Sequence, residues 1–262
     1  MTVTAFTQEL RQRDVILYYT GLFHFILAVI VLGLSFIDDR TIMGLNAWVK
    51  PFKFSISIGI YAWTYGWLMF YLKRKRLVKF LSWGIAVTMV IEIACLLIQA
   101  ARGVRSHYNV SSAFDASIFS TMGTMIAFNT IILVIVFGLF LIEKPKINPS
   151  YLLGIRLGMI TFLLASAIGG IMISNFQHAV GVADGGEGLP LLNWSTKGGD
   201  LRIGHFLGMH GIQVIPFLAY LISVSNIKWK NLAVTAIFLV YTGLIGFVFF
   251  QAMQGIPLIA FE

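Results

Sequence analysis

Long apolar stretches recur along most of the chain, and short polar connections separate them. A helix that crosses a membrane needs about 20 mostly apolar residues, and about seven segments meet that requirement. These segments are residues 15–37, 52–72, 80–101, 117–142, 151–175, 204–224 and 232–256. The pattern therefore predicts an all-α membrane protein, a bundle of about seven transmembrane helices in a single domain that spans residues 1–262.

The composition supports a location in lipid. Hydrophobic residues make up 58% of the chain and charged residues 11%, whereas a soluble domain carries about 45–50% apolar and about 25% charged residues. A net charge of +8 would indicate nucleic acid as the partner of a soluble protein. In a membrane protein it indicates basic loops that face anionic lipid on the cytoplasmic side. We therefore expect the lipid bilayer as a partner and no nucleic acid.

Lysine and arginine predict the orientation. With a cytoplasmic N-terminus, twelve of the 19 basic residues fall on the cytoplasmic side and seven on the outside. The run KRKR at 73–76 decides the bias, because basic residues close to the helix ends set the topology. The N-terminus is therefore expected in the cytoplasm and the C-terminus outside.

Two outer loops, residues 102–116 and 176–203, are expected to cap the bundle. The second contains the turn-forming elements DGGEG and KGGD, in which glycine can adopt a positive φ. Loops of this length are often lids or binding loops, although this one can equally be a solvated cap. We expect Asp200 and Arg202 to pair with groups at Arg105–Asp115 and hold the cap closed, with Arg102 also part of it.

Polar groups near the middle of the predicted helices are candidate site residues. His24, Glu92 and Asn129 lie about 13–20 Å from the outer boundary, at 1.5 Å per residue. A carboxylate or imidazole at that depth costs several kcal/mol unless it is paired or neutral. We therefore expect these groups to face the bundle interior. Glu92 and Gln99 share one helical face with Arg102, which extends the polarity outward.

Two further groups, His210 and Gln213, share a face of the sixth predicted helix. The polar faces together predict a cavity that opens outward and ends near the midplane. Its expected ligand- or cofactor-binding residues are His24, Glu92, Gln99, Asn129, His210 and Gln213. Polar stripes also serve simply to hold membrane helices together, so this alternative stays open.

The five histidines raise the question of a metal or haem. His205 and His210 are five residues apart, about 140° around an ideal helix, so they do not form a helical zinc pair. Haem b held by His24 and His210 is one candidate cofactor, and a divalent metal is the other. The candidate metal ligands are His107, His178, His205, His210, Asp115 and Asp200. No CxxCH motif is present, which excludes covalently attached haem.

Three function classes follow from these groups. The first is a membrane-embedded ligand- or cofactor-binding protein, with haem- or quinone-linked redox chemistry as one version. The second is a metal-dependent membrane hydrolase that uses the outer histidines. The third is a proton-coupled transporter or sensor of a small molecule, with Glu92 as the coupling group.

Three runs of the chain form a recognisable set: GGDLRIGHFLGMHGIQVIPFL, QAARGVRSHYN and NAWVKPFKFSISIGIYAW. Together they resemble an uncharacterised family of bacterial multi-spanning integral membrane proteins. The likeness covers most of the chain, and a GGDLRxxHFxGxHxxQ-type run is its most specific motif. The resemblance implies a location in the bacterial inner membrane and no particular function.

Single-cysteine reporters test the predicted topology. Cysteine at Lys75 and cysteine at Gly186 should react with a membrane-impermeant reagent from opposite sides of the membrane. The control is the unsubstituted chain, whose lone Cys95 lies in an apolar run. Labelling of both positions from one side would refute the orientation.

Overall fold

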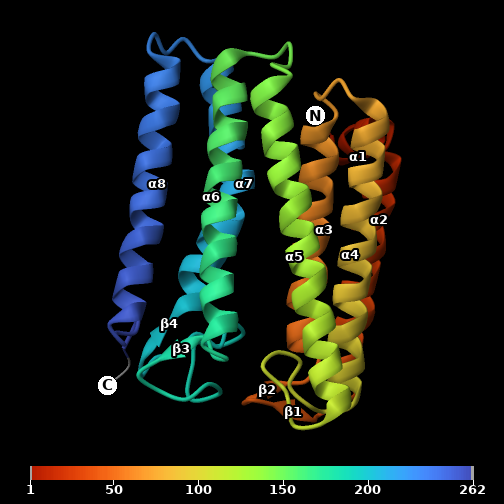
Figure 1. Ribbon diagram of the computed structural model, residues 1–262, viewed down its shortest axis with the longest axis vertical. Helices are drawn as coiled ribbons and strands as arrows, with labels where there is room; N and C mark the ends of the chain where they lie inside the picture. Colours follow the sequence, from red (N-terminus) through yellow and green to blue (C-terminus); the bar gives the residue numbers. More distant parts are fainter. Residues whose placement is uncertain (1, 261–262) are drawn as a thin grey trace. The chain divides into compact units, whose positions relative to one another are not determined.

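The computed structural model describes residues 2–260, and it is all-α apart from two short strand pairs (Figure 1). The helices in this part of the chain are α1 (Val3–Arg13), α2 (Val15–Leu34), α3 (Val49–Met69), α4 (Lys75–Ala101), α5 (Ala113–Ile142), α6 (Pro149–Ser174), α7 (Leu201–Val224) and α8 (Lys230–Met253). Antiparallel pairs are formed by β1 (Thr41–Ile42) with β2 (Leu45–Asn46), and by β3 (Ala179–Val180) with β4 (Gly199–Asp200). The chain divides into two compact units, one up to Val136 and one from Phe137 onward.

Six helices are long and apolar enough to cross a membrane: α2, α4, α5, α6, α7 and α8. The chain is therefore a multi-pass membrane protein, as the composition predicts. The expected second segment folds as α3 but is not among the six. It carries Lys50, Lys53 and several hydroxyl and aromatic residues, and almost half of its residues are buried against the rest of the protein.

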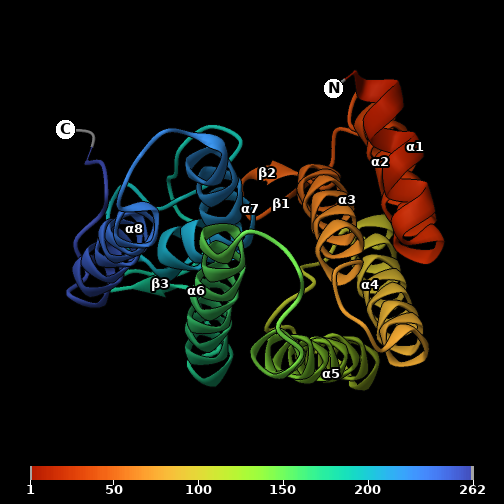
Figure 2. The same cartoon turned by 90° about the horizontal axis from the view of Figure 1, so that it is seen from above.

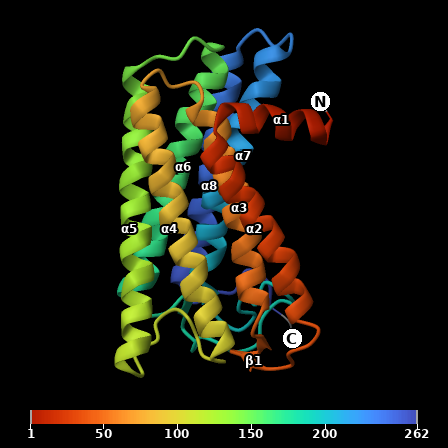
Figure 3. The ribbon, with the colours of Figure 1, turned by 90° about the vertical axis from the view of Figure 1, so that its right-hand side faces the viewer.

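A surface helix that the hydrophobic pattern did not predict opens the first unit. α1 runs across the direction of α2 (Figure 3). Asp14 forms the joint, because its Oδ1 accepts the backbone N–H groups of Ile16 and Leu17 at the start of α2. Its other oxygen accepts a 2.5 Å hydrogen bond from the Ser82 hydroxyl on α4. One carboxylate thus links α1, α2 and α4.

The first unit is held together by close packing of α2 against α3, with α4 against both (Figure 2). A Cβ built on Gly21 of α2 would lie only 2.2 Å from the Trp63 ring and 3.1 Å from the Gly59 carbonyl oxygen. The missing side chains therefore let the two helices approach. This is the small-residue packing common in membrane bundles.

Small residues also allow close packing in the second unit, between α6 and α7. Gly154 packs against Ala219, where an added Cβ would lie 2.2 Å from the Ala219 Cβ. Gly158 faces Pro216 and the Gly211 carbonyl oxygen, at 2.9 and 3.0 Å from such a Cβ. Successive turns of α6 thus present glycine to α7, and α8 packs beside this pair.

Short polar turns close the strand end of each unit. In the first unit, Arg40 forms a 2.6 Å ion pair with Asp38, and the Trp48 indole N–H donates to the same carboxylate. Arg40 and then Trp48 hold the pKa of Asp38 below its ordinary value. In the second unit, β4 lies so close to the end of α8 that a Cβ on Gly199 would overlap the Ala252 carbonyl oxygen.

Gly158→Leu tests the α6–α7 contact. The leucine side chain would collide with Pro216 and force the helices apart, so we expect a loss of roughly 1–3 kcal/mol of stability. Thermal unfolding of the purified protein in detergent measures it. The matched control is Gly170→Leu on the same helix, because a Cβ on Gly170 meets no atom within 4 Å. Equal effects of the two substitutions would contradict the packing argument.

Candidate functional site

Three buried polar side chains of the first unit, from three different helices, share an unusual feature. They are His24 on α2, Ser55 on α3 and Glu92 on α4, and their exposed fractions are 0, 0 and 2%. Each has a side-chain polar atom without a hydrogen-bond partner. Buried polar atoms are rarely left in this state, since desolvation without compensation is costly. We call these three residues the polar centre.

The His24 ring is fixed by its own helix. Nδ1 lies 2.7 Å from the carbonyl oxygen of Thr20, one turn earlier. A carbonyl only accepts, so Nδ1 carries the proton of this bond. In the neutral imidazole, this leaves the unpartnered Nε2 as a lone pair.

The Glu92 carboxyl makes no hydrogen bond within residues 2–260, and its Oε2 is fully buried. Its neighbours include Cys95, one turn further along α4 and 5% exposed. The Lys50 ammonium on the first turn of α3 acts on Glu92 electrostatically, without forming an ion pair with it. Glu92 is therefore a buried carboxyl without a hydrogen-bond partner among the described residues.

A second buried cluster lies on the same side of α4. The Asn129 side-chain N–H₂ on α5 donates to the Tyr61 hydroxyl of α3 at 2.8 Å. Its oxygen lies 3.5 Å from the Thr88 hydroxyl, one turn from Glu92. Asn129 thus faces the interior, as its position in an apolar segment predicts. It joins α3, α4 and α5 through one amide.

At the β1–β2 end of the first unit, Asp115 organises the 102–112 connection. It is 4% exposed, and its Oδ1 accepts from Gln99 at 2.9 Å and from the Arg102 guanidinium. Its Oδ2 accepts from the Ser112 hydroxyl at 2.5 Å. Gln99 is fully buried on α4, seven residues after Glu92.

His107 lies at this same end and is not a free ligand. Its Nδ1 is 3.2 Å from the Lys50 ammonium and 3.1 Å from the Ser106 hydroxyl. The ring packs against Phe54, with centroids 5.9 Å apart. Lys50 therefore contacts His107 and also acts electrostatically on Glu92.

The histidines of α7 are bound to backbone oxygens. His205 Nδ1 lies 2.8 Å from the Ala165 carbonyl oxygen of α6, and His210 Nδ1 lies 2.9 Å from that of Phe206 one turn earlier. Gln213, half-buried on α7, follows one turn after His210. These contacts hold α7 to α6 and orient the His210 ring.

The loop between α6 and α7 forms ion pairs of its own in the second unit, and the expected pairing with residues Arg105–Asp115 of the first unit stays a prediction. Asp200 is fully buried, caps α7 and pairs with Arg202 at 2.6 Å. His178 Nδ1 lies 3.3 Å from Asp184 and 3.8 Å from Asp200. Asp184 and Asp200 thus both have partners that are close to them in the sequence.

The predicted metal-ligand set does not assemble. Nowhere in residues 2–260 do three or more histidine, cysteine, aspartate or glutamate side chains form a group that could hold a metal ion. The histidine–carboxylate group at His178 is already occupied by Arg202 and by backbone N–H groups. The geometry therefore does not support the metal-dependent hydrolase.

Ser55 and Thr88 are buried residues whose role could not be predicted from the sequence. A single serine or threonine in an apolar helix usually bonds to its own backbone, so the sequence gives no signal for a site role. Lys50 gives no signal either, because a lysine near the end of a membrane helix is common. What Ser55, Thr88 and Lys50 face depends on how each helix is oriented about its own axis, and only the structure shows this orientation.

No protein-family model, curated protein or solved structure matches the chain. This agrees with an uncharacterised family from which no function can be transferred. Any function therefore has to be argued from the residues described above.

A double-mutant cycle tests the Tyr61–Asn129 contact. Tyr61→Phe and Asn129→Ala should show a coupling of about 0.6 kcal/mol, and at most about 1.7, as for other hydrogen bonds between membrane helices. Reversible unfolding in mixed micelles measures it. Tyr61→Phe combined with Thr121→Ala is the control, because the Thr121 hydroxyl bonds only to its own helix. Purely additive Tyr61 and Asn129 effects would show that the contact is absent.

Proposed function

We propose that the protein crosses the bacterial inner membrane seven times, with its N-terminus in the cytoplasm and its C-terminus outside. The six apolar helices support this, and α3 supplies the seventh span from within the first unit. The basic run after α3, KRKR at 73–76, then lies on the cytoplasmic side. The β1–β2 end of the first unit and the β3–β4 end of the second lie outside.

We further propose that the first unit is a proton-coupled binding site for a small molecule, as in a transporter or a sensor. The observation that carries this proposal is the buried, unpartnered carboxyl of Glu92. An ionised carboxylate in such a place costs several kcal/mol. Glu92 therefore holds a proton until a cationic or hydrogen-bonding ligand takes the place of that proton.

The surrounding groups suit that role. Glu92 lies nine residues before the end of α4, about 14 Å below it. Gln99 and Asp115 lie between it and the β1–β2 end, and Lys50 acts on it from the same direction. Protons and ligand would thus approach from outside, past Lys50 and His107. His24 and Ser55 supply polar atoms for the ligand.

The infrared spectrum tests the protonation of Glu92. Purified protein in lipid at neutral pH should show the carbonyl stretch of a protonated carboxylic acid that shifts in heavy water. Glu92→Gln should remove this band. Asp39→Asn is the control, because Asp39 is an exposed carboxylate whose loss should leave the band unchanged. If wild-type protein lacks the band, or if Glu92→Gln retains it, the proposal fails.

Coupling is then measured in proteoliposomes with a pH gradient. Wild-type protein should collapse the gradient when the ligand is present, and Glu92→Gln should bind ligand without moving protons. Compounds that raise the thermal stability of wild-type protein identify the ligand for this assay.

One observation favours a second candidate, a haem- or quinone-linked redox protein. The Thr20 bond leaves His24 Nε2 as an unpartnered lone pair, which is the state of a metal-ligating imidazole. An absorption spectrum of gently purified protein decides it. A Soret band that shifts on reduction and disappears in His24→Ala would establish haem, whereas a colourless protein would remove the haem version of this candidate.

A further inference from the structure

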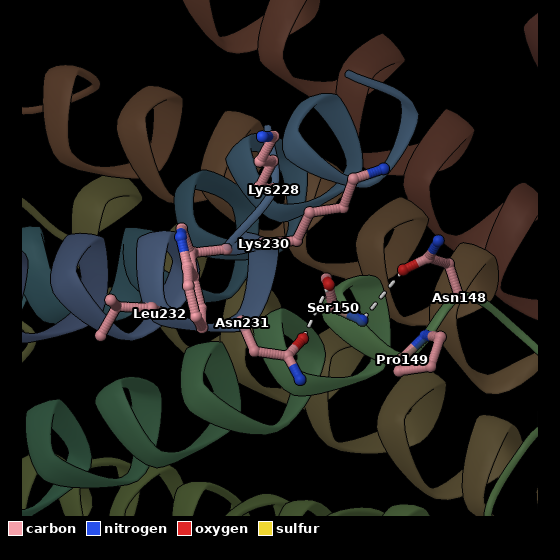
Figure 4. A pocket seen from close by; sticks show the side chains of 8 residues that line it. Asn148, Pro149, Ser150, Lys228, Lys230, Asn231 and Leu232 are labelled. Carbon is pink, nitrogen blue, oxygen red and sulfur yellow. Dashed lines mark hydrogen bonds between the residues drawn. The ribbon is translucent and has the colours of Figure 1, made fainter. Parts of the chain in front are cut away.

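A pocket of about 420 Å³ lies in the second unit (Figure 4). Its end of the unit is opposite β3 and β4 (Figure 1). It forms where α6 and α8 begin. Its lining consists of Asn148, Pro149, Ser150, Lys228, Trp229, Lys230, Asn231 and Leu232. Neither the polar centre nor any group of the proposed proton-coupled site belongs to it.

The polar groups of this pocket are almost all donors. Ser150, 5% exposed, lies between two asparagines (Figure 4). Its backbone N–H donates to the Asn148 side-chain oxygen at 2.9 Å, and its hydroxyl donates to the Asn231 side-chain oxygen at 2.7 Å. Both amide oxygens are therefore used, and both side-chain N–H₂ groups are left without a partner among the described residues.

The charges have the same sign. Lys228 and Lys230 line the pocket and no acidic residue does. Lys230 donates to the Ser223 carbonyl oxygen at 2.7 Å, which fixes its stem beside the pocket. Lys228 is exposed and has no hydrogen bond or ion pair within residues 2–260. The first backbone N–H groups of α8 add donors, because no side chain caps them.

We propose that this pocket binds a phosphate-bearing anion. Phosphate offers acceptor oxygens in every direction, which matches two amide N–H₂ groups and two ammonium groups with no competing carboxylate. The apolar rim favours a phospholipid headgroup as its source. Trp229 is 75% exposed and Leu232 66%, and α8 is the least buried of the six apolar helices.

Binding of phosphatidylglycerol to the purified full-length protein tests the proposal, with native mass spectrometry as the readout. Removal of one charged donor by Lys228→Gln should weaken binding about tenfold. The matched control is Lys146→Gln, which removes the same charge at the same end of the unit but outside the pocket lining. The control should bind as wild type does.

A second arm separates the two sources of phosphate. Inorganic phosphate and phosphatidylcholine are titrated against the same variants. Preference for phosphatidylglycerol that Lys228→Gln abolishes supports a lipid headgroup. Binding of inorganic phosphate that Lys228→Gln weakens, with no lipid preference, supports a free phosphate compound. Equal losses in Lys228→Gln and Lys146→Gln, or no binding of any of these anions, would overturn the proposal.

Discussion

Inside a bilayer no water is present to bond with polar groups, and the whole structure follows from this constraint. The backbone meets it by forming helices. Hydroxyl side chains in the spans meet it locally, as when Thr20 donates to the Ile16 carbonyl oxygen and Thr161 to that of Leu157. Against this background the buried atoms of His24 and Glu92 that lack a hydrogen-bond partner among the described residues are exceptions.

The class of the fold and the positions of its long helices could be predicted from hydrophobicity alone. α3 shows the limit of that signal, because a helix packed among others can carry lysines and hydroxyls without failing to fold. α1 shows another limit. Its helix depends on contacts with residues about 60 positions away in the sequence, such as Phe6 stacked on Trp67 at 5.3 Å and Arg13 over the same ring at 3.8 Å.

The candidate site was partly predictable. The depth of His24, Glu92 and Asn129 follows from their place in apolar segments, and the structure buries all three. Their partners could not be predicted, because partners depend on how each helix is rotated about its axis. The loops show the same limit. Whether Asp200 pairs with Arg202 or with another residue depends on the path of the glycine-rich segment before it, and residue spacing in the sequence does not define that path.

Asp14 connects three helices of the first unit through a single side chain. This carboxylate bonds to the start of α2 and to the Ser82 hydroxyl of α4, and α1 ends at the residue before it. Ser82 and Glu92 lie on one helix, ten residues apart. Loss of the Asp14 carboxylate would therefore remove the cap of α2 and the contact with α4 at the same time.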